Sequence, residues 1–114
     1  MKEIQLTARL KIHDGKLEEF KVVAASALET VREKDTGVRQ YDWFLSADQS
    51  ECVVRERYVD SQALLDHLAI VSEQLGALVG LSDLSLELYG DPSPELLQAL
   101  DAFNPAVLSY LQGL

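Results

Sequence analysis

The sequence of 114 residues has little cysteine, few basic side chains and no long apolar run. The single cysteine, Cys52, excludes an intramolecular disulfide framework and any metal site built from several cysteines. Ten Lys and Arg against nineteen Asp and Glu give a net charge of −9, so nucleic acid or an anionic membrane would repel the chain. No apolar run approaches the roughly 18 residues of a membrane span, and the N-terminus has no apolar signal core. We therefore expect a cytoplasmic protein that binds neither nucleic acid nor membranes.

What the chain does contain is enough apolar sequence for one domain. Hydrophobic residues make up 47% of it and charged residues 25%, which is typical of a globular protein and excludes a disordered chain. A chain of this length buries a real but modest core, which a partner subunit can complete.

The periodicity of the sequence changes between strand and helix several times. Alternating apolar and polar residues predict a strand, whereas apolar residues at steps of three and four predict a helix. We expect strands at 4–12, 38–45, 51–59 and 84–89, and helices at 16–34 and from a cap at Asp60 and Ser61 to about 80, where Gly76 and Gly80 loosen the end. Gly37 is suited to the left-handed turn that often ends a helix.

This order is β-α-β-β-α-β, which predicts an α+β fold of the ferredoxin-like sandwich type. Both helices are then expected to cover one face of the sheet, with the other face open. Residues 1–90 form this domain. The open face is either solvated or covered by a second subunit.

Residues 91–114 form a tail that we expect to be helical. Ser93 is a candidate N-cap with Pro94 in the first helical position, and Asn104 and Pro105 repeat this start signal. Apolar residues continue to the end of the chain, so the tail must pack on its own domain or on a second subunit as a dimer clasp.

His67 is the first candidate for chemistry, because it lies at the edge of the apolar stripe of the second helix. A structural histidine hydrogen-bonded to a neighbour is one interpretation. A general base that points into a cavity is the other, since an unperturbed pKa near ~6.5 suits proton transfer at neutral pH.

The middle strands carry the other candidate side chains. Tyr41 and Trp43 share a strand face, where they either pack in the core or form a flat wall for an aromatic ligand. Glu56 lies on the same face as Tyr58 and Cys52, and a buried carboxylate there needs a partner. Cys52 itself is interpreted as a small buried hydrophobe.

Three stretches of the sequence resemble the antibiotic biosynthesis monooxygenase family, whose members are dimeric α+β barrels. These are residues 15–20, the segment from Gly37 to Tyr41, and the strand-to-helix junction at 56–68, together spread over about residues 4–90. The family commonly has proline where this chain has Asp14, a change confined to the turn before the first helix.

The resemblance implies a homodimer whose sheets pack face to face, with a pocket for a small aromatic ligand between sheet and helices. Characterised relatives oxygenate polycyclic phenols or quinols without metal or flavin, and others bind and degrade heme. His67 matches the histidine common in the second helix. The heme-degrading branch has an asparagine where this chain has Ala8, and many relatives have tryptophan where it has Tyr58, which argues against heme degradation.

The resulting hypothesis is a monooxygenase that oxidises a quinol or phenolic molecule with O2 and needs no cofactor or metal. Its base is His67, assisted by Tyr58 as a second catalytic residue, and its substrate contacts are Tyr41, Trp43 and Glu56. A deprotonated phenol is electron-rich enough to pass an electron to O2 in a dry pocket. The alternatives are a catalytically silent homodimer that binds a small molecule or serves as a scaffold, and a heme-binding relative.

Overall fold

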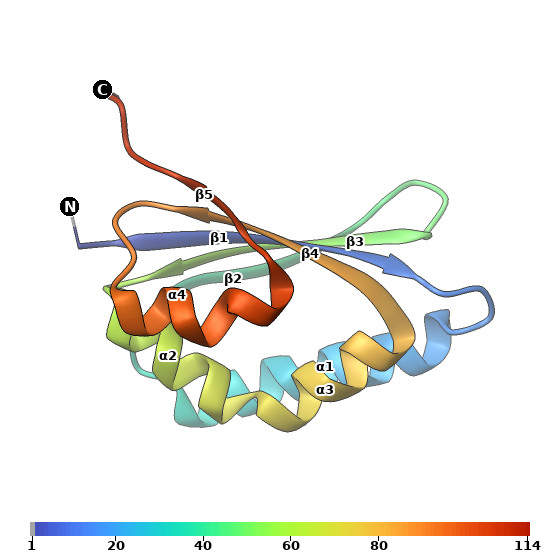
Figure 1. Ribbon diagram of the computed structural model, residues 1–114. Coiled ribbons are helices and arrows are strands. Elements are labelled where there is room, and N and C mark those ends of the chain that lie inside the picture. Colours follow the sequence, from blue (N-terminus) through green and yellow to red (C-terminus); the bar gives the residue numbers. More distant parts are fainter. Residues whose placement is uncertain (1) are drawn as a thin grey trace.

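The computed structural model describes residues 2–114 and has two layers, a five-stranded sheet and a layer of helices on one of its faces (Figure 1). The elements are β1 (Ile4–Ile12), α1 (Leu17–Lys34), β2 (Val38–Leu45), β3 (Glu51–Tyr58), α2 (Ser61–Ile70), α3 (Ser72–Leu81), β4 (Ser82–Tyr89), α4 (Pro94–Leu100), the 3-10 turn η1 (Asp101–Phe103) and β5 (Ala106–Leu108). The predicted α+β class and ferredoxin-like order are confirmed.

The sheet has the order β2-β3-β1-β4-β5, with β1 in the centre. β1 pairs antiparallel with both β3 and β4, which places it in the middle of the sheet. Its alternating apolar residues lie on the face that the helices cover. Ile4, Leu6 and Leu10 are buried there. The register places Glu56 between Leu6 and Tyr41, at the centre of the buried face.

The helix expected after Asp60 is in fact two helices. Asp60 is the cap as predicted, because its carboxylate accepts the Ala63 N–H at 2.8 Å. The chain then bends by 74° between α2 and α3, and the break falls at Val71. Gly76 and Gly80 lie inside α3 rather than at a frayed end. The bend lets both halves follow the twisted sheet, and neither proline nor glycine marks it locally.

The tail is helical only in its first part. Ser93 caps α4 by accepting the Leu96 N–H, and Pro94 takes the first position, as predicted. The second expected helix is wrong. Asn104 has a left-handed backbone (φ 46°), which turns the chain back, and β5 then pairs in parallel with β4.

Among residues 2–114, no single helix is long and apolar enough to cross a membrane. The bent pair α2 and α3 passes that test only when the two are joined, by length and composition.

Gly37 follows the end of α1, where a close contact with α2, and not a left-handed turn, requires glycine. It does not have the left-handed conformation that the sequence predicts. A Cβ atom at this position would lie 2.6 Å from the Ala63 Cβ, closer than two carbon atoms can approach. Gly37 therefore lets the start of α2 pack directly on the segment that joins α1 to β2.

We expect Gly37→Ala to destabilise the fold by about 1–3 kcal/mol, because the added methyl overpacks a contact between two backbone-fixed atoms. Gly76→Ala is the matched control. It adds the same methyl inside α3 with no atom within 4 Å, so it should stabilise the helix by about 0.5–1 kcal/mol. Urea unfolding of both variants checks the prediction. Equal effects would show that the Gly37–Ala63 contact is not tight in solution.

Candidate active site

The buried face of the sheet and the helices enclose a cavity with mostly apolar walls. Its polar lining side chains are Tyr41, Trp43, Glu56, His67 and Gln74. About 60 Å³ of the interior is open to the centres of water-sized molecules, which is room for several waters or a small organic molecule. Four of the five site residues predicted from the sequence thus meet around one cavity.

His67 projects from α2 toward the sheet and is only 3% exposed. Its Nδ1 lies 3.0 Å from Oδ2 of Asp35. Asp35 ends α1, and its Oδ1 accepts the Gly37 N–H at 3.1 Å. Since a carboxylate only accepts, Nδ1 carries the ring proton, and Nε2 keeps a free lone pair. This is the geometry of a histidine base oriented by a carboxylate.

Asp35 was missed by the sequence analysis, which placed it only in the stop signal of the first helix. Its side chain is 2% exposed, so its carboxylate belongs to the site and not to the surface. It lies 32 residues before His67, and helical or strand periodicity does not relate positions so far apart. No local signal distinguishes this aspartate from an ordinary residue at a helix end.

Glu56 lies beside His67, with its Oε1 3.7 Å from Nε2, too far for a hydrogen bond. The hydroxyl of Tyr58 donates to the same Oε1. Burial raises the pKa of Glu56 to about 8, although the Tyr58 hydrogen bond acts to lower it. Glu56 is therefore mostly protonated at neutral pH and has a proton to donate.

Burial also lowers the pKa of His67, while the hydrogen bond and the charge of Asp35 act to raise it. The imidazole is thus neutral at neutral pH. The site holds a neutral base and a neutral acid side by side, each supported by its own hydrogen-bond partner. Such a pair can take a proton from one atom of a bound molecule and donate to another.

Tyr41 and Trp43 form an aromatic wall of the cavity. The Tyr41 ring packs edge-on against Trp43 and His67, with centroids 5.6 and 5.0 Å apart. Burial raises the pKa of Tyr41 strongly, and the nearby Glu56 adds to this, so its hydroxyl stays protonated. The Trp43 Nε1 is the one buried side-chain nitrogen or oxygen in residues 2–114 without a hydrogen-bond partner. A ligand with an acceptor oxygen would satisfy it.

Tyr58, the fifth predicted site residue, is fully buried behind Glu56 and is not part of the cavity lining. Its ring lies 5.1 Å from that of His67. Burial and the adjacent Glu56 raise its pKa strongly. The geometry is that of a residue that positions Glu56 rather than one that touches a substrate.

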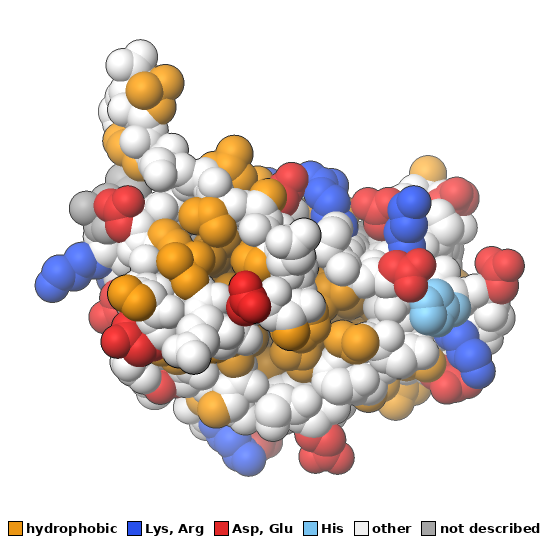
Figure 2. All heavy atoms as spheres, viewed as in Figure 1, with side chains coloured by type: hydrophobic (Ala, Val, Ile, Leu, Met, Phe, Trp, Pro, Cys, Tyr) orange, Lys and Arg blue, Asp and Glu red, His pale blue; other side chains and the backbone are white. Residues whose placement is uncertain are grey.

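The far side of the cavity is closed by the segment after β4. Leu100 of α4 and Phe103 of η1 line it, and Leu96 and Leu100 are buried in the core of their own chain. We call Leu100 and Phe103 the roof of the cavity. Figure 2 shows apolar side chains gathered over α4 and the adjoining helices.

Cys52 is the small buried hydrophobe expected from the sequence. It is 2% exposed, and burial raises the pKa of its thiol to about 11, so it is not a nucleophile at neutral pH. No group of three or more His, Cys, Asp or Glu within residues 2–114 is placed to hold a metal ion.

The sequence model of one family, antibiotic biosynthesis monooxygenase, matches residues 4–70, more than half of the chain. The chain belongs to the antibiotic biosynthesis monooxygenase family. Asp35, Tyr41, Trp43, Glu56 and His67 all fall within the matched segment, whereas the roof falls outside it. No match was found among curated proteins.

Solved structures with the same fold include relatives from several microorganisms. MupZ from Pseudomonas fluorescens is 23% identical with a TM-score of 0.87, over 100% of this chain and 94% of that one. SnoaB, a cofactor-independent oxygenase from Streptomyces nogalater, is 21% identical with a TM-score of 0.69, over 82% and 96%. A conserved protein from Methanosarcina mazei is 20% identical with a TM-score of 0.70, over 78% and 92%. At these identities the likeness establishes the fold.

Proposed function

We propose that this family member is a cofactor-independent monooxygenase that oxidises a quinol or phenolic small molecule with O2. The observation that carries the proposal is the 3.0 Å contact between His67 Nδ1 and Asp35 Oδ2 beside a mostly apolar cavity, because it leaves the Nε2 lone pair of a cavity-lining histidine free. Membership of the family and the likeness to SnoaB support the same chemistry. The limited space favours a substrate with one aromatic ring over a polycyclic one.

In the proposed reaction, the Nε2 atom of His67 takes the proton from the phenolic hydroxyl of the substrate. Asp35 stabilises the imidazolium that forms. The Trp43 N–H and the Glu56 O–H donate to oxygen atoms of the substrate. The resulting anion transfers an electron to O2, and the apolar walls hold the radical pair together until they combine. One oxygen atom enters the ring and the other leaves as water, so the quinol supplies all the electrons.

Oxygen uptake by the purified, metal-free protein tests this proposal. We expect uptake above autoxidation with a panel of hydroquinones and small phenols, unaffected by chelator and abolished by His67→Ala. Asp66→Asn is the matched control, because it neutralises an exposed carboxylate on the same helix, which accepts a hydrogen bond from the Gln62 side chain. No uptake over the panel, together with ligand binding, would favour the silent small-molecule-binding protein instead.

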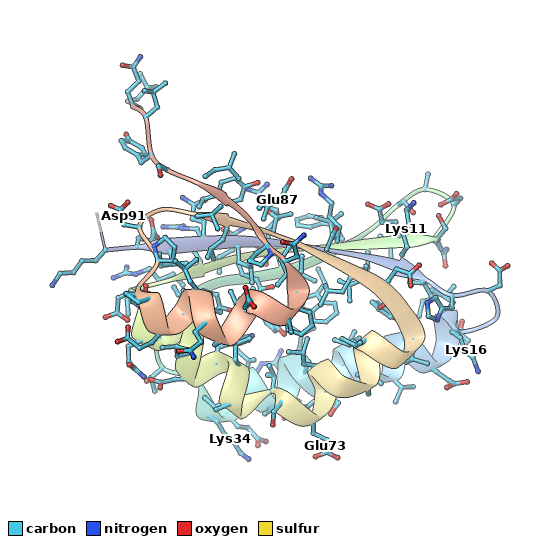
Figure 3. All side chains as sticks on the ribbon, viewed as in Figure 1. Lys11, Lys16, Lys34, Glu73, Glu87 and Asp91 are labelled. Atoms are coloured by element: carbon cyan, nitrogen blue, oxygen red, sulfur yellow. The ribbon has the colours of Figure 1, made fainter. Side chains whose placement is uncertain are left out.

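We also propose that the chain forms a homodimer through the face of the sheet away from the helices. That face carries charged side chains, including the labelled Lys11 and Glu87 (Figure 3). The chain after β5 leaves the sheet on the same side (Figure 1) and exposes Tyr110, Leu111 and Leu114. We call this segment, residues 109–114, the arm. An apolar segment beside a charged surface is expected to pack on a partner.

Sedimentation at micromolar concentration should give a dimer. Truncation after Leu108 keeps the roof and β5 but removes the arm, so it should weaken the dimer without unfolding the chain. A monomeric wild-type protein would overturn the proposal.

A further inference from the structure

We propose that the same cavity also catalyses the enolisation of small ketones, with His67 removing the proton next to the carbonyl group and Glu56 donating to the carbonyl oxygen. This inference rests on the site of the proposed function but uses no oxygen. It extends the ligand class from phenols to carbonyl compounds with an acidic α-hydrogen.

The distance between the two groups is the first support. His67 Nε2 and Glu56 Oε1 are 3.7 Å apart, do not hydrogen-bond each other and both line the cavity. In a ketone, the oxygen and the α-carbon are separated by a single carbon atom, so one molecule can present its two reacting atoms to two neighbouring groups such as this imidazole and this carboxyl group. One bound ketone can therefore contact both at once.

Glu56 has the environment of a hydrogen-bond donor. It lies in the sheet between Leu6 and Tyr41. Within residues 2–114, the one basic side chain at salt-bridge distance from its carboxyl group is the imidazole of His67. The Tyr58 hydroxyl donates to Oε1, so the proton is carried by Oε2, the other oxygen of the carboxyl group whose Oε1 lies 3.7 Å from His67 Nε2. A carboxylic acid kept neutral in an apolar site stabilises an enolate oxygen much better than water does.

Trp43, another residue of the cavity lining, carries a second donor. Its Nε1–H is buried and has no partner in the described chain. An enolate formed in the cavity carries negative charge on oxygen, which an indole N–H can stabilise. The residues that carry the two donors and the base thus all line one cavity with mostly apolar walls.

The step is balanced without an oxidant. The α C–H bond breaks, its proton passes to His67 Nε2, and its electron pair forms the carbon–carbon double bond. The carbonyl π electrons move to the oxygen, which receives the hydrogen bond or the proton of Glu56. Reversal returns a proton to carbon, so in D2O each cycle can replace hydrogen by deuterium.

Deuterium incorporation into 2-indanone in neutral D2O buffer without oxygen, followed by proton NMR, tests the inference. We expect exchange at least about 10³-fold faster than in buffer alone, so that the loss of a single donor can be measured above the background. His67→Ala should return it to the buffer rate. Glu56→Leu should lower it by about 10²–10³-fold because a donor to the oxyanion is lost, and Glu56→Gln, which keeps an N–H donor, should fall between.

Glu87→Gln is the matched control. Glu87 also accepts a hydrogen bond from a tyrosine two residues later, the Tyr89 hydroxyl at 2.8 Å, but it lies on the opposite face of the sheet. This variant should exchange 2-indanone at the wild-type rate. A circular dichroism melt of each variant separates loss of a donor from loss of the fold.

The outcomes also separate this inference from the oxygenase proposal. Exchange without oxygen uptake from any phenol would support enolisation and count against the oxygenase. Oxygen uptake without exchange would overturn enolisation alone. Exchange that survives in both Glu56 variants would also overturn it, because the acid would then have no part in the step.

Discussion

Asp35→Asn is expected to lower kcat/KM for oxygen uptake by about 10²–10⁴-fold, nearly as much as His67→Ala. The carboxylate now holds the proton on Nδ1, which keeps the Nε2 lone pair free. An asparagine amide can instead donate to Nδ1, and the ring proton then moves to Nε2, where it blocks the base. Activity is therefore lost because the imidazole has the wrong tautomer, although the side chain at position 35 still contacts it.

The combination of variants makes this prediction sharper. Asp35 acts only through His67, so the double variant should be no slower than His67→Ala alone. The pH profile is a second readout. The charge of Asp35 raises the pKa of His67, so its removal should shift the base limb of kcat/KM to lower pH. Asp35→Asn activity within twofold of wild type would contradict the role assigned to Asp35.

Glu56→Gln is expected to gain stability relative to wild type as the pH rises. Between acid and alkaline buffer, the difference between the two unfolding free energies should shift by about 5 kcal/mol in favour of the glutamine variant. The folded-state pKa of Glu56 is raised from 4.5 to about 8, so the folded protein holds a proton that the unfolded chain releases above pH 4.5. Wild type therefore loses stability as the pH rises from 4.5 to 8. Glutamine resembles the protonated acid in shape and does not titrate.

Urea unfolding of both proteins at a series of pH values measures this difference. Tyr41, Tyr58 and His67 face Glu56 and are present in both proteins, so to first order their own titrations cancel. A difference that does not change with pH would show that Glu56 is ionised in the folded protein, and it would remove the acid from the proposed site.

The fold was predictable largely because its signals are local. The alternation in β1 and the cap at Asp60 depend on residues within a few positions of each other. The bend at Val71 follows from packing on the sheet, and β5 forms because β4 offers an edge for pairing. Both features depend on contacts with distant parts of the chain, so the periodicity of the local sequence could not predict them.

The candidate site was predictable in part for a similar reason. Strand alternation placed Glu56 on the same face as Tyr58 and Cys52, which is the buried one, and helical spacing placed His67 at the edge of the apolar stripe. Both residues line the cavity. Asp35 and Phe103 could not be found in this way. The first meets His67 only when α2 packs against Gly37, and the second reaches the cavity only when the chain turns back after β4.

The roof has a consequence for how such a protein can change. The groups assigned to proton transfer, Asp35, Glu56 and His67, lie within the segment matched by the family, whereas Leu100 and Phe103 lie beyond it. Substitutions in the roof can therefore alter the size and shape of an accepted molecule while the acid and the base keep their positions. Part of the cavity wall is therefore encoded outside the segment that carries the proton-transfer groups, so that part can evolve, or be engineered, without moving them.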